Sequence, residues 1–411
     1  MRKLLKKIVI KFSAVYKNIL FRYFENRMQK KIWKGHDEVL SWADDNVLSE
    51  NMQKLEGDCL NSDDPIVKKG FNLRQKSLKN FRNKYKKEIG IRILIHLPSK
   101  SISPGGYSTF NNLSDSLSFL GISTKTIKVG KNISDVFIKF KPTIFISSDN
   151  KLYLDKIDWK YIKEYRKDNN LKIGLTASIE AYGNTPLQGR LEWAKKHGID
   201  FYYSFRAKEY LNSRVDYNLF FKYGYRIHSI EFGANPLLYF PVPSMKKDID
   251  FVFLASSNLD KQKRYFEWLP SIVNNYVGFI DGPGWSKTSQ WASQPTHKYL
   301  YSRAKVGLNL HIDDSIDWAS ELNERTYILA ACGVPQLIDN AKLLDGRFSK
   351  QAIFKAKNPH VYANMFEYML NNKDECQKRA IKAMEEVFDK HTTFHRAEGF
   401  ILELIRLKEE Q

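Results

Sequence analysis

Three residues near the start of a predicted helix have the chemistry to bind a phosphate group. Asn323, Arg325 and Thr326 offer hydrogen-bond donors at the beginning of an apolar segment that ends at Gly333. A helix N-terminus favours anions because its first N–H groups are unpaired and its dipole is positive there. The guanidinium of Arg325 can also form two parallel hydrogen bonds with a phosphate. The segment therefore predicts an anion-binding site.

Three further side chains follow predicted strands and are candidates for proton transfer. His96 ends the segment IRILIHL, Asp149 follows TIFISS, and Glu180 follows KIGLTAS. A positioned His or carboxylate can take a proton from a reacting hydroxyl group. Each of these residues is also common in turns and caps, and that alternative stays open. We take His96 and Glu180 as the leading catalytic candidates.

The elements that would position these residues alternate between apolar strands and helical segments. The alternation begins at Ile91 and restarts at Asp250, after a stretch that contains Pro236, Pro241 and Pro243. A chain of 411 residues suits two domains. Alternating strands and helices imply parallel sheets, which bind ligands beyond the carboxyl ends of their strands. The pattern predicts an α/β protein with two Rossmann-like domains that face a cleft.

A Gly pair, Gly105 and Gly106, lies between the first predicted strand and a helical pattern that begins near Phe110. In a strand–loop–helix unit such a loop can approach a ligand closely. An ordinary tight turn is the alternative interpretation.

We expect four segments along the chain. Residues 31–88 are polar and charged, and we expect helices and linkers there that pack around the first sheet domain. The predicted segments are a basic helical extension (1–88), a first Rossmann-like domain that binds the acceptor (89–243), a second that binds the donor (244–390), and a C-terminal helix that returns to the first domain (391–411).

Positive charge is concentrated at the N-terminus. The chain carries a formal charge of +20, and residues 1–36 hold eleven Lys and Arg against one acid, Glu25. Apolar residues recur there at spacings of three and four, which predicts a basic amphipathic helix. Such a helix can lie on an anionic membrane surface, or it can dock on the protein's own core. Nucleic acid is not an expected partner, because no nucleic-acid-binding motif accompanies the charge.

The rest of the composition favours the cytoplasm. Three scattered cysteines form no CxxC pair, so neither a disulfide framework nor a zinc site is expected. Lysines interrupt the N-terminal apolar residues, which excludes a secretory signal and a transmembrane helix there. We expect a cytoplasmic protein, peripheral at the inner membrane face if the basic helix binds lipid.

From Asp250 onward the chain resembles group 1 nucleotide-sugar glycosyltransferases, and it looks most like the spore-maturation or spore-coat branch. The resemblance covers about 180 residues and extends loosely to GGYSTF and KIGLTAS. The motifs that carry it are FGANP (232–236), DFVFLASSNLDKQKR (250–264), GFIDGPGW (278–285), AKVGLNLH (304–311), NERTYILAACGVPQLID (323–339) and HTTFHR (391–396).

The resemblance implies the GT-B fold and the transfer of a sugar to a glycan or lipid-linked acceptor in cell-surface polysaccharide synthesis. It also implies that no metal is needed, and no metal-binding cluster stands out, although Asp313 and Asp314 are adjacent. His311 would line the pocket. The donor-binding residues it implies are Gly105, Gly106, Lys261, Arg264, Asn309, Glu321, Asn323, Glu324, Arg325 and Thr326.

One position departs from the family pattern. Ile328 stands where the family places a carboxylate that binds the ribose hydroxyls. Glu324 and Glu321 precede it by four and seven residues, so a continuous helix would present all three on one face. We hypothesise that one of these glutamates reaches the ribose or the donor sugar. The alternative is a degenerate protein that acts in binding or as a scaffold.

Overall fold

The computed structural model describes two compact units, each built on one parallel sheet. The six-stranded unit comprises residues 75–236, 318–324 and 388–411. The five-stranded unit comprises the described residues up to Arg74, with 237–317 and 325–387. The described residues are Val15, Ile19, Arg22, Tyr23, 35–88, 90–179, 185–244, 246–257, 259–285 and 291–409.

The six-stranded sheet has the order β2-β1-β3-β4-β5-β6, and every neighbouring pair of strands is parallel. The strands β1, β3 and β5 are apolar and almost fully buried, as expected for a parallel sheet covered by helices. The edge strand β2 is polar, and only its Ile127 is buried. The strands are β1 (Arg92–Leu97), β2 (Ser123–Lys128), β3 (Ile144–Ser147), β4 (Lys172–Thr176), β5 (Phe201–Ser204) and β6 (Ile227–Ser229).

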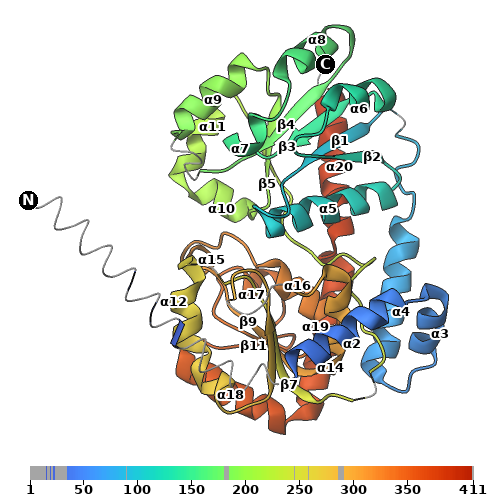
Figure 1. Cartoon of the computed structure of the whole chain (residues 1–411), viewed down its shortest axis with the longest axis vertical. Coiled ribbons are helices and arrows are strands. Elements are labelled where there is room, and N and C mark those ends of the chain that lie inside the picture. The colour runs from blue at the N-terminus through green and yellow to red at the C-terminus, as the bar shows by residue number, and fades with distance from the viewer. Residues whose placement is uncertain are drawn as a thin grey trace, which may run out of the picture. The chain divides into compact units, whose positions relative to one another are not determined.

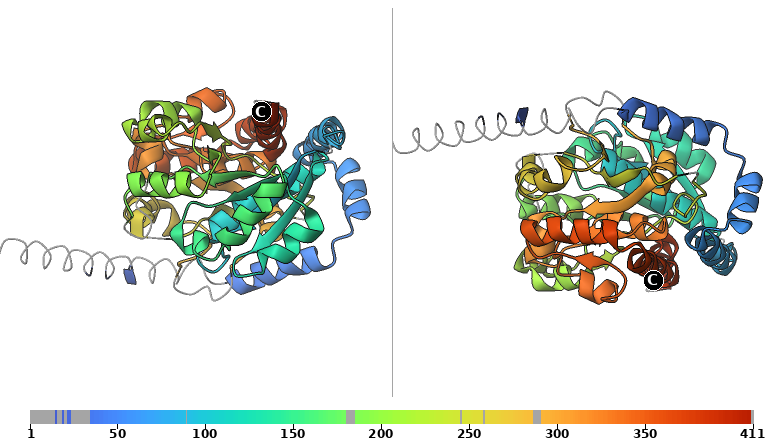
Figure 2. Two further views of the ribbon diagram at one scale, coloured as in Figure 1. Left: turned by 90° about the horizontal axis from the view of Figure 1, so that it is seen from above. Right: turned by 90° about the horizontal axis from the view of Figure 1, so that it is seen from below.

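Most helices of this unit connect successive strands along the chain, and the last helix returns from the C-terminus (Figures 1 and 2). That last helix packs on α5, where Phe394 stacks on Phe119 with 4.6 Å between ring centroids. The helices are α5 (Pro104–Phe119), α6 (Ile133–Phe140), α7 (Lys151–Leu154), α8 (Trp159–Asp168), α9 (Leu187–Lys196), α10 (Lys208–Ser213), α11 (Asn218–Lys222) and α20 (Thr393–Glu409), with the short 3-10 helix η2 (Val215–Tyr217).

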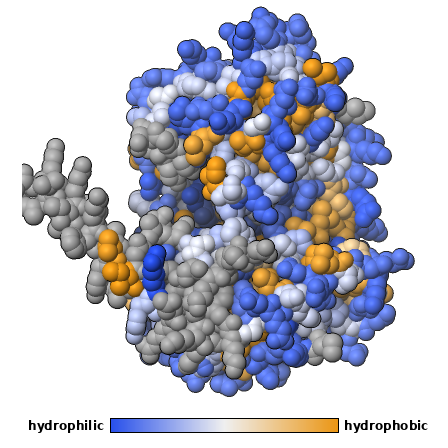
Figure 3. Space-filling view, viewed as in Figure 1, coloured by the Kyte–Doolittle hydropathy of each residue, from blue (hydrophilic) through white to orange (hydrophobic). Residues whose placement is uncertain are grey.

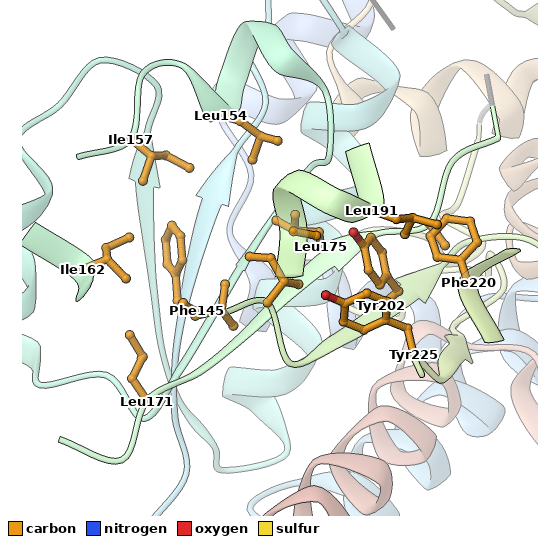
Figure 4. Close-up of a cluster of buried hydrophobic side chains, with 14 of the residues drawn as sticks. Phe145, Leu154, Ile157, Ile162, Leu171, Leu175, Leu191, Tyr202, Phe220 and Tyr225 are labelled. Carbon is orange, nitrogen blue, oxygen red and sulfur yellow. The ribbon is translucent and has the colours of Figure 1, made fainter. Parts of the chain in front are cut away.

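A buried apolar cluster joins the sheet of this unit to its helices (Figure 4). Phe145, Leu175 and Tyr202 come from three successive strands, while Ile162 and Leu191 come from α8 and α9. The removal of such side chains from water is the main force that holds helices on a sheet. The cluster fixes the strand ends from which candidate residues project.

The five-stranded sheet has the order β11-β10-β9-β7-β8 and is also fully parallel. The prediction of an α/β protein with two parallel sheets is therefore confirmed. Its strands are β7 (Ile249–Leu254), β8 (Gly278–Asp281), β9 (Ala304–Asn309), β10 (Gln336–Ile338) and β11 (Phe354–Lys355). Its helices include α12 (Leu259–Trp268), α13 (Pro270–Val273), α14 (His297–Arg303), α15 (Asp313–Asp317), α16 (Glu324–Ala331), α17 (Leu344–Arg347), α18 (Pro359–Asn371) and α19 (Lys373–Lys390), with the 3-10 helix η3 (Gln294–Thr296).

The helices that precede the first sheet also belong to the five-stranded unit for most of their length. They are α2 (His36–Leu48), α3 (Met52–Leu60) and the first part of α4 (Pro65–Phe81). Glu50 accepts hydrogen bonds from Lys298 at 2.6 Å and from Tyr299 at 2.7 Å. The expectation that residues 31–88 pack around the first sheet is thus corrected for 35–74, because buried polar and aromatic partners for these residues lie on α14 and β8.

Most of the basic N-terminal segment lies outside the described residues. Val15, Ile19 and Tyr23 are described, and each is more than half exposed. Among the described residues, no helix is long and apolar enough to cross a membrane. The face drawn in Figure 3 is largely hydrophilic, with apolar residues in scattered patches.

Candidate active site

The turn after β7 is held in place by the motif GFIDGPGW. Gly282 and Gly284 have positive φ angles of 137° and 90°, and a Cβ on either residue would collide with the backbone of residues 255–257. The Ser257 N–H donates to the Pro283 carbonyl at 2.7 Å, and the indole of Trp285 donates to the Ala255 carbonyl at 2.7 Å. The glycines therefore allow the two loops to lie against each other, which fixes the carboxyl end of β7.

Asn309, at the carboxyl end of β9, forms hydrogen bonds to the start of α16 and to the start of β10. This fully buried side chain donates from Nδ2 to Thr326 Oγ1 at 2.9 Å and to Gln336 Oε1 at 2.7 Å. Its Oδ1 accepts from Arg325 Nη1 at 3.1 Å. The predicted residues Asn309, Arg325 and Thr326 are thus brought together.

The guanidinium of Arg325 has a fixed orientation in the five-stranded unit. Its Nε donates to the carbonyl of Leu254, the last residue of β7, at 2.7 Å. The guanidinium carbon lies 4.7 Å from the centre of the Phe253 ring, within range of a cation–π interaction. Because these contacts set the plane of the guanidinium, two oxygens of a phosphate would meet a preorganised partner.

A buried charged network lies beside this residue. Asp339 accepts hydrogen bonds from the backbone N–H of His311 at 2.7 Å and from Arg264 Nε at 3.1 Å, and its other oxygen lies 2.7 Å from His311 Nδ1. Burial favours the neutral acid, but His311 and Arg264 outweigh it and hold the pKa of Asp339 below its usual value. His311 Nε2 lies 3.3 Å from Thr326 Oγ1, so the network ends at α16.

Lys261, on α12, also lies near the end of β7. Lys261 Nζ donates to Ser256 Oγ at 2.9 Å. The backbone carbonyl of Ser256 in turn accepts from the hydroxyl of Tyr265 at 3.2 Å. Burial, opposed by Arg325, raises the pKa of Tyr265 to about 12, so its hydroxyl stays a neutral donor at physiological pH. Five predicted donor-binding residues therefore belong to one unit: Lys261, Arg264, Asn309, Arg325 and Thr326.

The other predicted donor-binding residues belong to the six-stranded unit. Gly105 and Gly106 lie in the first turn of α5, which begins at Pro104, so they form no separate loop. Glu321 forms an ion pair with Arg206. Asn323 is half-buried in the segment before α16.

Glu324 lines a small pocket within the six-stranded unit. Its Oε1 accepts a hydrogen bond from Asn112 Nδ2 at 2.6 Å. Burial raises the pKa of Glu324 to about 7, although the Asn112 hydrogen bond acts in the opposite direction. The remaining pocket residues are Thr109, Leu113, Phe205, Ile230, Glu231, Phe232, Gly233, Thr393 and Arg396.

Comparisons with known proteins find the same fold in solved structures, and they find a family match in the second half of the chain. Residues 262–401 match a family model described as glycosyl transferase-like. The chain is a glycosyltransferase of the GT-B fold. No curated protein sequence matches it.

Three solved structures show the same fold as this glycosyltransferase at low sequence identity. A glycosyltransferase from Rickettsia africae is 12% identical with a TM-score of 0.50, and the match covers 78% of this chain and 100% of that chain. A sucrose-phosphate synthase from Thermosynechococcus elongatus is 11% identical with a TM-score of 0.50, covering 78% and 100%. BGT of T4 phage, in complex with its UDP-glucose substrate, is 14% identical with a TM-score of 0.52, covering 77% and 99%.

The described proton-transfer candidates of the glycosyltransferase, His96 and Asp149, are both engaged by neighbouring side chains. His96 is buried in β1 with Nδ1 3.0 Å from Ser147 Oγ, and burial lowers its pKa to about 4. Asp149 is paired with Arg190 at 2.5 Å and accepts from Thr176. Glu180 lies outside the described residues. The structure therefore gives His96 a structural environment, and the role of Glu180 stays a prediction.

Several site residues of the glycosyltransferase were not singled out from the sequence. Gln336 begins the strand β10 and Asp339 directly follows it, and a carboxylate directly after PQLI was a usable signal. Asn112 lies on α5 and carried no signal, because its partner Glu324 is 212 residues away. Within the described part of the chain, no group of three or more His, Cys, Asp or Glu side chains is placed to hold a metal ion.

Proposed function

We propose that this glycosyltransferase moves a sugar from a nucleotide-sugar donor to a glycan or lipid-linked acceptor in cell-surface polysaccharide synthesis. The observation that carries the proposal is the fixed guanidinium of Arg325 at the ends of β7 and β9. Parallel sheets bind ligands at this edge. The UDP-glucose substrate of the T4 phage structure supports the donor class. The order of the motifs also favours the spore-maturation or spore-coat branch.

In this proposal the five-stranded unit stabilises the leaving nucleoside diphosphate. Arg325 and Lys261 supply positive charge, and Thr326 lies in the first turn of α16, where N–H groups favour an anion. Arg264 is already paired with buried Asp339, so it acts mainly by positioning that network. Charge on the diphosphate grows as the bond to the sugar breaks, and preorganised donors favour that change. We propose that no metal ion is needed.

A binding or scaffold protein without turnover is the second candidate. The observation that favours it is Ile328, which is buried and offers no hydrogen bond to a ribose. Both candidates retain the Arg325 cluster, so nucleotide binding alone does not separate them. Turnover does.

The test of the proposed function is the release of nucleoside diphosphate from UDP-, GDP-, CDP- and ADP-sugars by the full chain. We expect release from one of these donors, undiminished by a metal chelator and lost in Arg325→Ala. The matched control is Arg379→Ala, because Arg379 also donates to backbone carbonyls and lies over an aromatic ring, Phe354. Nucleotide binding with no release from any donor would favour the scaffold candidate instead.

We further propose that residues 1–36 hold the enzyme on an anionic membrane surface. Their excess of Lys and Arg supports this, since basic segments near such a surface gain about 1 kcal/mol per residue. Flotation with liposomes that contain anionic lipid should be lost when residues 1–36 are deleted. Equal flotation of the intact and truncated proteins would contradict the idea.

A further inference from the structure

The segment that forms α2 and α3 is strongly acidic. Residues 35–64 hold nine Asp and Glu against one Lys. Glu50 is paired with Lys298, and Glu56 is paired with Arg74. Five further acidic side chains are exposed and form no ion pair with a described residue: Glu38, Asp44, Asp45, Asp58 and Asp63. The segment therefore presents negative charge that the described part of the chain does not neutralise.

The acids of α2 lie on its exposed side together with an apolar residue. Glu38 and Asp45 are seven residues apart, which is close to two helical turns. Asp44 precedes Leu48 by four residues, so these two side chains also lie one above the other. Leu48 is 85% exposed, while the two buried residues of the helix lie on its other side. We call Glu38, Asp44, Asp45 and Leu48 the acidic face of α2.

The segment before α2 carries the opposite charge. Residues 1–34 hold eleven Lys and Arg against one acid, Glu25. The apolar side chains of Val15, Ile19 and Tyr23 are four residues apart, a spacing that puts them on one side of a helix. They are 56%, 60% and 64% exposed, so the structure leaves this apolar side uncovered. The segment and the acidic face of α2 are thus complementary in charge, and each exposes apolar side chains.

The connection between them allows the segment to fold back. Gly35 precedes α2 with a positive φ of 92°, which glycine adopts without strain. Residues 24–34 can span about 36 Å when extended, against a length of about 20 Å for α2. A connection of this length also gives an effective concentration of about 1 mM, so weak contacts are enough to hold the segment. A second copy of the chain at micromolar concentration competes poorly with the attached segment.

From this complementarity we propose that residues 1–34 bind the acidic face of α2 in the same chain when no membrane is present. Their Lys and Arg side chains pair with Glu38, Asp44 and Asp45, and their apolar side covers Leu48. Anionic lipid attracts the same charges and the same apolar side, so a membrane and the acidic face compete for one segment. The binding to α2 is independent of the proposed glycosyl transfer, and only the competition rests on the proposed membrane binding.

Cross-linking of the full chain tests the contact directly, because a carbodiimide joins a lysine to a carboxylate only where the two meet. We expect cross-links from the lysines of residues 3–11 to Asp44 and Asp45 in about 20 mM salt. At about 500 mM salt we expect a loss of about fivefold or more, because salt screens exposed charges. Lysines of residues 30–34 adjoin α2 in the sequence and are not counted. In a mixture of ¹⁵N-labelled and unlabelled protein, each cross-link should join two peptides of the same label.

Flotation with liposomes that contain anionic lipid tests the competition. The variant Glu38→Gln/Asp44→Asn/Asp45→Asn removes the charges of the acidic face, so the segment is released from α2. We expect this variant to bind the liposomes about tenfold more tightly than the wild type, because a segment that is free about 10% of the time binds lipid about tenfold more weakly.

The matched control variant is Asp155→Asn/Glu164→Gln/Asp168→Asn. It neutralises three exposed acids of the six-stranded unit, so it changes the net charge of the chain by the same amount. Its liposome affinity should stay within about twofold of the wild type, since salt screens charges that do not contact the segment.

The readouts separate the possible failures. Absence of cross-links from residues 3–11 to the acidic face of α2 at low salt overturns the inference. Cross-links found only between labelled and unlabelled peptides place the segment on a second copy and also overturn it. If the acidic-face variant gains no more liposome affinity than the control variant, the competition is refuted. If the wild type does not float at all, the proposed membrane binding fails, and the cross-links alone decide the binding to α2.

Discussion

Replacement of Asp339 by Asn should destabilise the five-stranded unit strongly. The Asp339 carboxylate is fully buried and receives the His311 N–H, the His311 ring and the Arg264 guanidinium. An Asn side chain has one acceptor oxygen in place of two, and its NH₂ group would face a donor. It also leaves Arg264, whose side chain is 16% exposed, without its buried counter-charge.

The magnitude follows from what remains unpaired. Removal of one partner of a buried ion pair costs about 3–5 kcal/mol. We expect a fall of about 3 kcal/mol in the free energy of unfolding at pH 7, because Arg264 keeps a longer contact with Asp313 at 3.5 Å. The matched control is Asp345→Asn. Asp345 pairs with Lys355 at 2.7 Å but is 63% exposed, and an exposed pair is worth at most about 1 kcal/mol.

The effect should also depend on pH in a defined direction. The folded-state pKa of Asp339 lies below the unfolded value of about 3.9. The contribution of ionised Asp339 to the free energy of unfolding is therefore fully present above about pH 5 and is lost as pH falls through the folded-state pKa. Urea unfolding of the wild type, Asp339→Asn and Asp345→Asn at pH 7, 5 and 3 measures this. If Asp339→Asn loses less than about 1 kcal/mol at pH 7, or as little as Asp345→Asn, our interpretation of the network is wrong.

Three further predictions concern the site. Arg325→Lys keeps the charge but not the planar fork, so nucleoside diphosphate binding should weaken by about tenfold, measured by calorimetry; unchanged affinity would contradict the bidentate role. Gly284→Ala should cost about 1–3 kcal/mol more than Gly130→Ala in urea unfolding, because both have positive φ but only Gly284 lies against backbone, and equal costs would contradict this. Asn112→Ala removes the hydrogen bond that lowers the pKa of Glu324, so the titration midpoint of the Glu324 carboxyl, followed by ¹³C NMR, should rise above about 7; a fall would contradict this role of the hydrogen bond.

The sequence was sufficient to predict the local parts of the fold. Apolar runs such as IRILIHL are buried strands, and the alternation with helices specifies parallel sheets. The donors at the start of α16 were also predictable, because helix N-termini and strand ends are local features of the chain. Lys261, Asn309, Arg325 and Thr326 therefore lie together near the ends of β7 and β9, as their motifs indicated.

Contacts between distant parts of the chain were not predictable in this way. The Asn112–Glu324 hydrogen bond joins residues 212 apart, and no local pattern shows that α5 would hold this carboxylate. Likewise, the polar character of residues 35–74 did not show which sheet they would cover, because that choice depends on partners such as Lys298 on α14. His96 looked accessible at a strand end, but its side chain is buried within the unit.

The most direct test of the central claim is thermal unfolding of the full chain with UDP, GDP, CDP, ADP and their sugar conjugates. A ligand at 100 times its dissociation constant adds about 2.7 kcal/mol of stability. We predict a selective rise for one nucleotide that is abolished by Arg325→Ala and retained by Arg379→Ala. No rise with any nucleotide, or a rise that survives Arg325→Ala, would contradict the donor site described above.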